Sequence, residues 1–151
     1  MLLGATVLLV MQQQWSRYSG RQAARDLATE FVNEVAKGDF LAAHSMLASE
    51  FSADTSVAAL RLVLDQRGIT KGARPHWRKL KNDGMFFRLR GRVENLDGRS
   101  LPLEMHVIKE AEQWRVFSLR LPLPGLRSNE SELLLPSRLG MVALLHGVVG
   151  R

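Results

Sequence analysis

The first part of the chain repeats its apolar residues at three- and four-residue steps. In residues 21–37 these positions are Ala24, Leu27, Ala28, Phe31, Val32 and Val35. This spacing places apolar side chains on one face of a helix, and Gly38 supplies the helix stop. Two shorter apolar stripes follow Asp39 and Ser56, which are both suitable N-caps. The pattern predicts three helices, with a break at residues 49–55 and the last helix ending at Gly68.

After Pro75 the apolar period changes to two. The alternation is weak in residues 76–81 and clear in residues 85–95. In the clear stretch the apolar face is Met85, Phe87, Leu89 and Val93, and the polar face is Arg88, Arg90, Arg92 and Glu94. Such alternation is typical of a strand with one buried face.

Two further strands complete the pattern, and Asp97-Gly98 before them is the strongest hairpin signal of the chain. The apolar face of the next strand is Leu101, Leu103, Met105 and Val107. In the last strand, residues 113–121, we expect Trp114, Val116 and Ser118 to face one way and Arg115, Phe117 and Leu119 to face the other way. Helices followed by an antiparallel meander indicate the α+β class.

The N-terminal segment is apolar and carries no charge up to Ser16. Its strongly apolar run ends at Gln12, about half of the roughly 20 residues that a spanning helix needs. We expect an uncleaved membrane anchor here, either truncated at its start or only dipping into the bilayer; the alternative is that the segment begins the first helix and packs on the domain. Arg17, Arg21 and Arg25 follow the run, so the positive-inside rule taken literally puts the domain in the cytoplasm.

The chain has 151 residues, of which 46% are hydrophobic and 24% are charged, and it contains no cysteine. This composition is typical of one globular domain. The lack of cysteine excludes a disulfide scaffold, a cysteine nucleophile and a thiolate metal site. We expect the anchor at residues 1–20, one domain at residues 21–122 and a C-terminal tail at residues 123–151.

Basic residues are concentrated in the middle of the chain. The whole chain has a net charge of +6, whereas residues 61–92 hold ten basic and two acidic residues, a local net charge of +8. The ten are Arg61, Arg67, Lys71, Arg74, Arg78, Lys79, Lys81, Arg88, Arg90 and Arg92. Such a concentration indicates attraction to anions or anionic surfaces and says nothing about the fold.

The order of elements, with the segments EFVNEVAKGDFLAAHSMLASEF and RGRVENLDGRSLPLEMHVIKEAEQWRVFSLRL, resembles the nuclear-transport-factor-like, ketosteroid-isomerase-like α+β cone superfamily. The Gly38-Asp39-Phe40 break and the closing Trp114-Arg115-Val116 strand carry the resemblance, which covers residues 21–122. It implies three helices packed on a curved antiparallel sheet of about four strands. Many similar bacterial domains sit behind an N-terminal anchor, some in secretion or envelope assemblies, so the resemblance implies a periplasmic domain.

Enzymes similar to this superfamily place an acid or a base in the cone pocket, and the candidates here are Glu104, His106 and His44. Glu104 and His106 lie opposite the apolar strand face, so we expect them to point to solvent. The four histidines lack metal-ligand spacing, and no phosphate loop, nucleophile elbow or dinucleotide fingerprint is present. The sequence therefore predicts no catalytic residue, no metal and no cofactor, and it favours a protein that is not an enzyme.

Arg88, Arg90 and Arg92 should project from one sheet face, and Arg78 joins them if the strand register allows. This face could bind phospholipid headgroups, an acidic protein or nucleic acid. Single-stranded nucleic acid needs stacking aromatic residues, and Phe86 alone lies on that strand face, so we disfavour nucleic acid. The alternative is a solvated face on which arginine stems cover apolar area.

Three aromatic residues, Trp77, Phe87 and Trp114, are expected to be core or cone-lining residues. The alternative is that they line a small-molecule pocket. The sequence favours a non-catalytic binding or assembly module of the bacterial envelope. It would be tethered to the membrane by its N-terminus and contact an envelope protein or anionic lipid. The competing hypothesis is a small-molecule-binding or lyase/isomerase-type cone enzyme. Assembly into a homo-oligomer is a further alternative.

Overall fold

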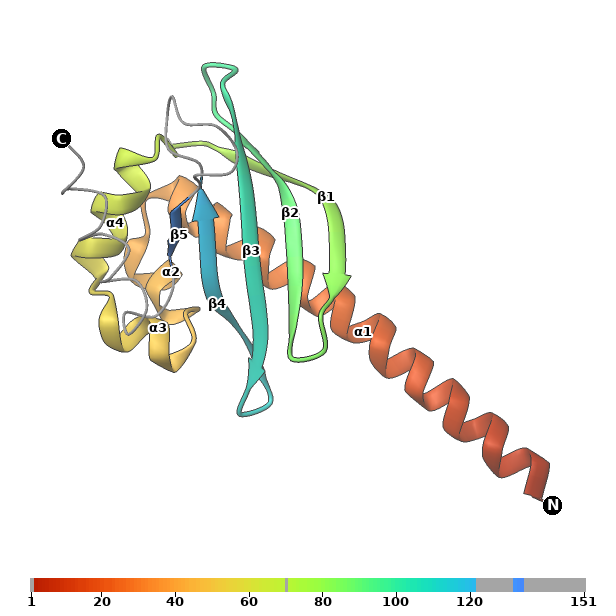
Figure 1. The fold of residues 1–151 in the computed structure, drawn as a ribbon. Coiled ribbons are helices and arrows are strands. Elements are labelled where there is room, and N and C mark those ends of the chain that lie inside the picture. The colour runs from red at the N-terminus through yellow and green to blue at the C-terminus, as the bar shows by residue number, and fades with distance from the viewer. Residues whose placement is uncertain (1, 70, 122–131, 135–151) are drawn as a thin grey trace, which may run out of the picture.

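The computed structural model describes residues 2–69, 71–121 and 132–134, and the side chains of residues 19–69 and 71–121 within them. Four helices and five strands form these parts of the chain (Figure 1). The helices are α1 (Leu2–Lys37), α2 (Phe40–Ser45), α3 (Ser49–Asp54) and α4 (Val57–Gln66). The strands are β1 (Arg74–Asn82), β2 (Phe86–Glu94), β3 (Ser100–Glu110), β4 (Gln113–Leu121) and β5 (Glu132–Leu134).

Local sequence signals place most helix ends. The long helix α1 ends at Lys37, and Gly38 follows with a positive φ of 83°, which glycine adopts without strain. The Asp39 side chain accepts a hydrogen bond from the Ala42 N–H, and Ser56 caps α4 in the same way. Both predicted N-caps are therefore confirmed.

Helix α3 occupies the stretch where the sequence pattern predicted a break, so the prediction of three helices is wrong. Its N-cap residue, Ala48, makes no side-chain capping bond. Instead, the Ala48 N–H donates to the Val116 carbonyl of β4, and Phe51 is buried in the core. Tertiary contacts therefore form this short helix where the sequence lacks a start signal.

The strands form one antiparallel sheet in the order β1-β2-β3-β4-β5. All four helices lie on one side of it, with α1 crossing behind the strands (Figure 1). We call the helix-covered side the inner face and the opposite side the outer face. The core lies between the helices and the inner face, and its most buried residues include Ala24, Ala28, Leu89, Met105 and Val107. The α+β class, with helices packed on an antiparallel sheet, is confirmed.

A β-bulge in β4 changes which residues face the core. His106 pairs with Ser118, whereas Val107 pairs with Val116, so Phe117 is the extra residue. After the bulge the alternation is shifted by one position. Leu119 is consequently buried on the inner face and Ser118 lies on the outer face, which corrects the predicted facing of this strand.

A second bulge lies in β1, where the register passes from Trp77 to Lys79. Gly91 of β2 lies against this bulge, and a Cβ there would be 2.2 Å from the His76 carbonyl oxygen. No other residue type fits so close an approach of two backbones. The same bulge removes Arg78 from the cross-strand pairing, and Lys79 pairs with Arg90 in its place.

No helix in residues 2–69 and 71–121 is both long and apolar enough to cross a membrane. The helix α1 is long, but its apolar run ends at Gln12, well short of the roughly 20 residues required. The predicted transmembrane anchor in residues 1–20 is therefore wrong. The membrane-anchored periplasmic location that the superfamily resemblance implied depended on this anchor and is contradicted as well.

Candidate functional site

The outer face of the sheet carries most of the charged side chains of β1 to β4, and no described helix covers it (Figure 1). The strand register arranges these side chains in rows. One row runs Lys79, Arg90, Glu104 and Arg120, and the row beside it runs Lys81, Arg88, His106 and Ser118. A third row holds His76, Arg92 and Pro102. We call the six cations of these rows the basic face: Lys79, Lys81, Arg88, Arg90, Arg92 and Arg120.

Glu104 is the acidic residue at the centre of the basic face. Its carboxylate accepts a hydrogen bond from Arg90 Nε and lies 3.0 Å from His106 Nε2. Burial alone would raise the pKa of Glu104, but the hydrogen bonds from Arg90 and His106 outweigh it and hold this pKa below 4.5. Glu104 is therefore charged near neutral pH and compensates part of the positive charge around it.

The His106 side chain is largely buried between its neighbours, with 13% of its surface exposed. Its ring stacks on Phe86 with ring centroids 4.7 Å apart, and Arg88 lies over the same Phe86 ring at 6.0 Å. Burial lowers the pKa of His106 below 6.5, and the hydrogen bond and charge of Glu104 offset this effect only in part. His106 is therefore neutral near pH 7, and it is more buried than the expected solvent-facing position.

Some cations of the basic face form ion pairs with acidic side chains, and others do not. Arg88 forms an ion pair with Asp83 at 2.8 Å, and Arg90 pairs with Glu104. Lys81 also pairs with Asp83, at 3.3 Å. Lys79, Arg92 and Arg120 have no acidic partner among the described residues, and the Nε atoms of the two arginines are buried without an acceptor there. The basic face consequently keeps guanidinium groups that a partner's anions could satisfy.

Sequence reasoning found part of this surface. The structure brings Arg88, Arg90 and Arg92 together on one face, whereas the bulge leaves Arg78 outside the rows. The sequence did not predict that Arg120 belongs to this face. Without the bulge, the alternation of the last strand would place Arg120 on the same side as Val116, which is the inner face. The position of Arg120 opposite Glu104 follows from the shifted register.

The catalytic candidates do not form an acid–base site in the core. Glu104 and His106 are on the outer face, and His44 Nε2 lies 2.6 Å from the Thr55 carbonyl oxygen. Ser118, His106 and Glu104 are the residue types of a hydrolytic triad, but the buried Ser118 hydroxyl has no hydrogen-bond partner among the described residues. Within those residues no group of three His, Asp or Glu side chains could hold a metal ion.

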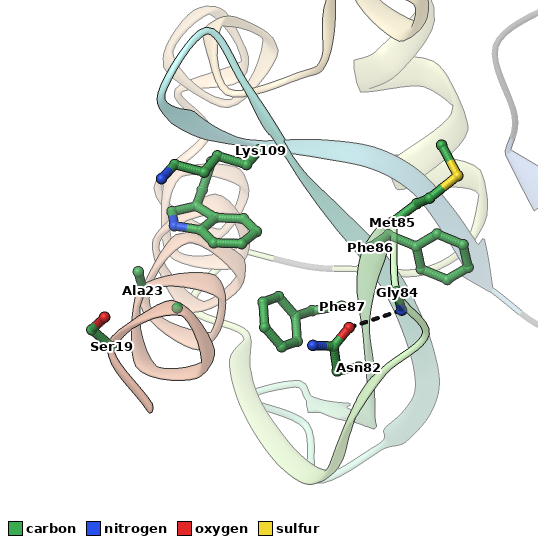
Figure 2. Close-up of a pocket in the computed structure, with 10 residues that line it drawn as sticks. Ser19, Ala23, Asn82, Gly84, Met85, Phe86, Phe87 and Lys109 are labelled. Atoms are coloured by element: carbon green, nitrogen blue, oxygen red, sulfur yellow. Dashed lines mark hydrogen bonds between the residues drawn. The ribbon is translucent and has the colours of Figure 1, made fainter. Parts of the chain in front are cut away.

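The aromatic candidates are separated. Phe87 and Trp114 are in contact, with ring centroids 5.3 Å apart, and they line a cavity of about 470 Å³ between α1 and the sheet (Figure 2). Trp77 is not among the described residues that line it. The Trp77 indole N–H donates instead to the Thr29 hydroxyl of α1 at 3.0 Å.

Comparison with known proteins gives no relative: no protein-family model, curated protein or solved structure matches this chain. The resemblance to the α+β cone superfamily therefore stays a prediction. The function must be argued from the basic face and the cavity themselves.

Proposed function

We propose that this domain is a non-catalytic binding module whose basic face docks onto an acidic segment of a partner protein. One observation carries the proposal. Six cations lie in rows on a sheet face that no described helix covers, and only two carboxylates among the described residues, Glu104 and Asp83, form ion pairs with three of them. Arginine guanidinium groups bind carboxylates through paired, directional hydrogen bonds.

Two features favour a binding module over an enzyme. The inner face opposite Glu104 and His106 is filled by apolar side chains, since Leu89, Met105 and Val107 are all fully buried. The acid and base candidates lie on the outer face, where they are hydrogen-bonded to each other. A general acid or base that serves a cone pocket would have to project from the opposite side of the sheet.

An acidic protein fits this face better than nucleic acid does. Stacking of bases needs an exposed aromatic ring. On the basic face Phe86 is the aromatic residue, and its ring already contacts His106 and Arg88. Phe86 is therefore not a free platform for a base.

The same proposal includes the cone shape that the superfamily resemblance implies. Bulges in β1 and β4 support it, because a bulge bends its strand and increases the local twist. A sheet that curves around the helices would leave its convex side for the partner. An experimental structure with a flat sheet would contradict this part of the proposal.

The test uses a labelled oligoglutamate peptide and two double variants of equal charge change. Arg92→Gln with Arg120→Gln removes the two arginines of the basic face that lack acidic partners among the described residues. Arg61→Gln with Arg99→Gln removes two exposed cations elsewhere, which pair locally with Asp65 and Asp97. We expect about tenfold weaker binding for the first variant and little change for the second, because each charge contact contributes modestly.

Two competing probes complete the experiment: single-stranded DNA and vesicles of phosphatidylserine and phosphatidylcholine. The unfolding midpoint of each variant is measured in parallel. Equal losses in both double variants would overturn the proposal. So would tighter binding of the wild-type chain to the DNA or to the vesicles than to the peptide.

A further inference from the structure

We propose that the cavity beside Phe87 and Trp114 binds a small amphipathic anion, which has a flat apolar body and one negative group. The cavity lies on the inner side of the sheet, between α1 and the ends of the β1–β2 and β3–β4 hairpins (Figure 2). Its volume of about 470 Å³ is within the usual range for small-molecule sites. Phe86 borders both the cavity and the basic face, but none of the six cations of the basic face lines the cavity, so the two proposals can fail independently.

The walls of the cavity suit an apolar body. Phe87 points from β2 toward the α1 residues Ser19 and Ala23 (Figure 2). Trp114 meets Phe87 at an angle of 53° between the ring planes. Two tilted rings offer edges and faces to a flat apolar ligand, and such aromatic contacts add to the area that the ligand buries.

A glycine of α1 brings the helix close to these rings. A Cβ at Gly20 would be 3.4 Å from Trp114 Cζ2 and 3.6 Å from Phe87 Cε2. Glycine is a poor residue inside a helix, where it destabilises relative to alanine. The lack of a side chain at this position leaves room between the helix and the aromatic pair.

One charged residue belongs to the described lining, and it is a cation. Lys109 of β3 is the cross-strand partner of Trp114 and extends toward the α1 side of the cavity (Figure 2). Its Nζ lies 3.1 Å from Glu112 in the neighbouring turn, and the Lys109 side chain is half exposed while that of Glu112 is almost fully exposed. Exposed ion pairs of this kind are weak, so a ligand anion can replace Glu112.

The hairpin that closes one side of the cavity is well ordered by hydrogen bonds. The Asn82 side chain accepts from the Gly84 N–H at 2.8 Å, and the Asp83 N–H donates to the Phe86 carbonyl. Gly84 has a φ of 88°, which suits glycine in this turn. The wall is therefore preorganised, which lowers the entropic cost of binding.

The test compares two fluorescent probes of similar shape with the full chain: anilinonaphthalene sulfonate, which is an anion, and phenyl-naphthylamine, which is neutral. Gly20→Leu fills the space beside the rings, and we expect it to weaken both probes by about tenfold or more. Lys109→Gln should weaken the anionic probe by about threefold and leave the neutral probe unchanged. Lys71→Gln removes an exposed lysine outside the cavity and serves as the charge control.

A variant of the basic face shows whether the probes bind in the cavity or on the basic face. Arg92→Gln with Arg120→Gln should leave binding of both probes unchanged, and a loss in that variant would mean that the sulfonate binds the basic face. Failure of the wild-type chain to bind either probe at a one-to-one ratio would overturn the proposal. Equal affinities of Lys109→Gln and Lys71→Gln for the anionic probe would do the same. If Gly20→Leu does not fold, Trp114→Phe tests the same wall with a smaller ring.

Discussion

Glu104 of β3 and Arg120 of β4 are cross-strand partners on the basic face, yet no ion pair joins them in the described structure. Glu104 turns its carboxylate to Arg90 of β2 and to His106 on its own strand. Arg120 consequently has no acidic partner among the described residues. This asymmetry is the reason to place a partner's carboxylates beside β4.

Replacing the central carboxylate should strengthen binding and weaken the fold. Glu104→Gln leaves Arg90 without its counter-charge, so the unfolding free energy should fall by about 1 to 2 kcal/mol. The same change adds one positive charge to the basic face and should tighten oligoglutamate binding about threefold. Urea denaturation and peptide titration measure the two effects. Asp97→Asn, an equal charge change in an exposed turn, is the control, and equal tightening by both variants would contradict the prediction.

The stability of the fold should depend on the titration of His106. Burial keeps its pKa in the folded state below the usual 6.5, so the unfolded chain takes up this proton at a higher pH than the folded chain does. The unfolding free energy should therefore fall as the pH drops through about 6.5 toward the folded pKa. His106→Gln lacks this titration and should lose less stability between about pH 7 and 5. Parallel declines of the wild type and the variant in urea denaturation would rule this out.

The contact between Trp77 and Thr29 should stabilise the packing of α1 on β1. It is a partly buried hydrogen bond between residues 48 positions apart in the sequence. Trp77→Phe and Thr29→Val should each lower the unfolding free energy by about 1 kcal/mol or more. Trp77→Phe removes the hydrogen bond and part of the packing, and Thr29→Val leaves the partly buried Trp77 indole N–H without its acceptor. The double variant should cost less than the sum of the two single variants. Strict additivity in thermal or urea unfolding would show that the bond contributes nothing.

The same substitution should have opposite effects at two glycines. Gly91→Ala places a Cβ 2.2 Å from the His76 carbonyl oxygen, so the β1–β2 pairing must shift. We expect a loss of about 3 kcal/mol, typical of severe backbone conflicts. Gly20→Ala places a Cβ at ordinary contact distance, 3.4 Å or more, from the Trp114 and Phe87 rings, and it should gain about 0.5 to 1 kcal/mol from helix propensity. Thermal unfolding of both variants measures these changes. An unchanged stability of Gly91→Ala would mean that the bulge in β1 can be rearranged.

The local parts of the fold could be predicted from the sequence because their causes lie within a few residues. Asp39 and Ser56 satisfy N–H groups three positions further along the chain. The turn at Gly98 needs a residue with positive φ, and the hydrogen bond from its N–H to the Asn95 carbonyl closes it. The alternation in β2 likewise fixed the common face of Arg88, Arg90 and Arg92 before any pairing was known.

By itself, then, the sequence determined the α+β class, the caps and turns, and a row of arginines on one strand. The tertiary structure decided the positions whose surroundings come from distant segments. It formed α3 through the contact of Ala48 with Val116, and it shifted β4 so that Arg120 joined the basic face. It also placed Trp77 against Thr29 and left Phe87 and Trp114 together at the cavity. Bulges and long-range packing depend on the register between strands, and no periodicity within one strand contains that information.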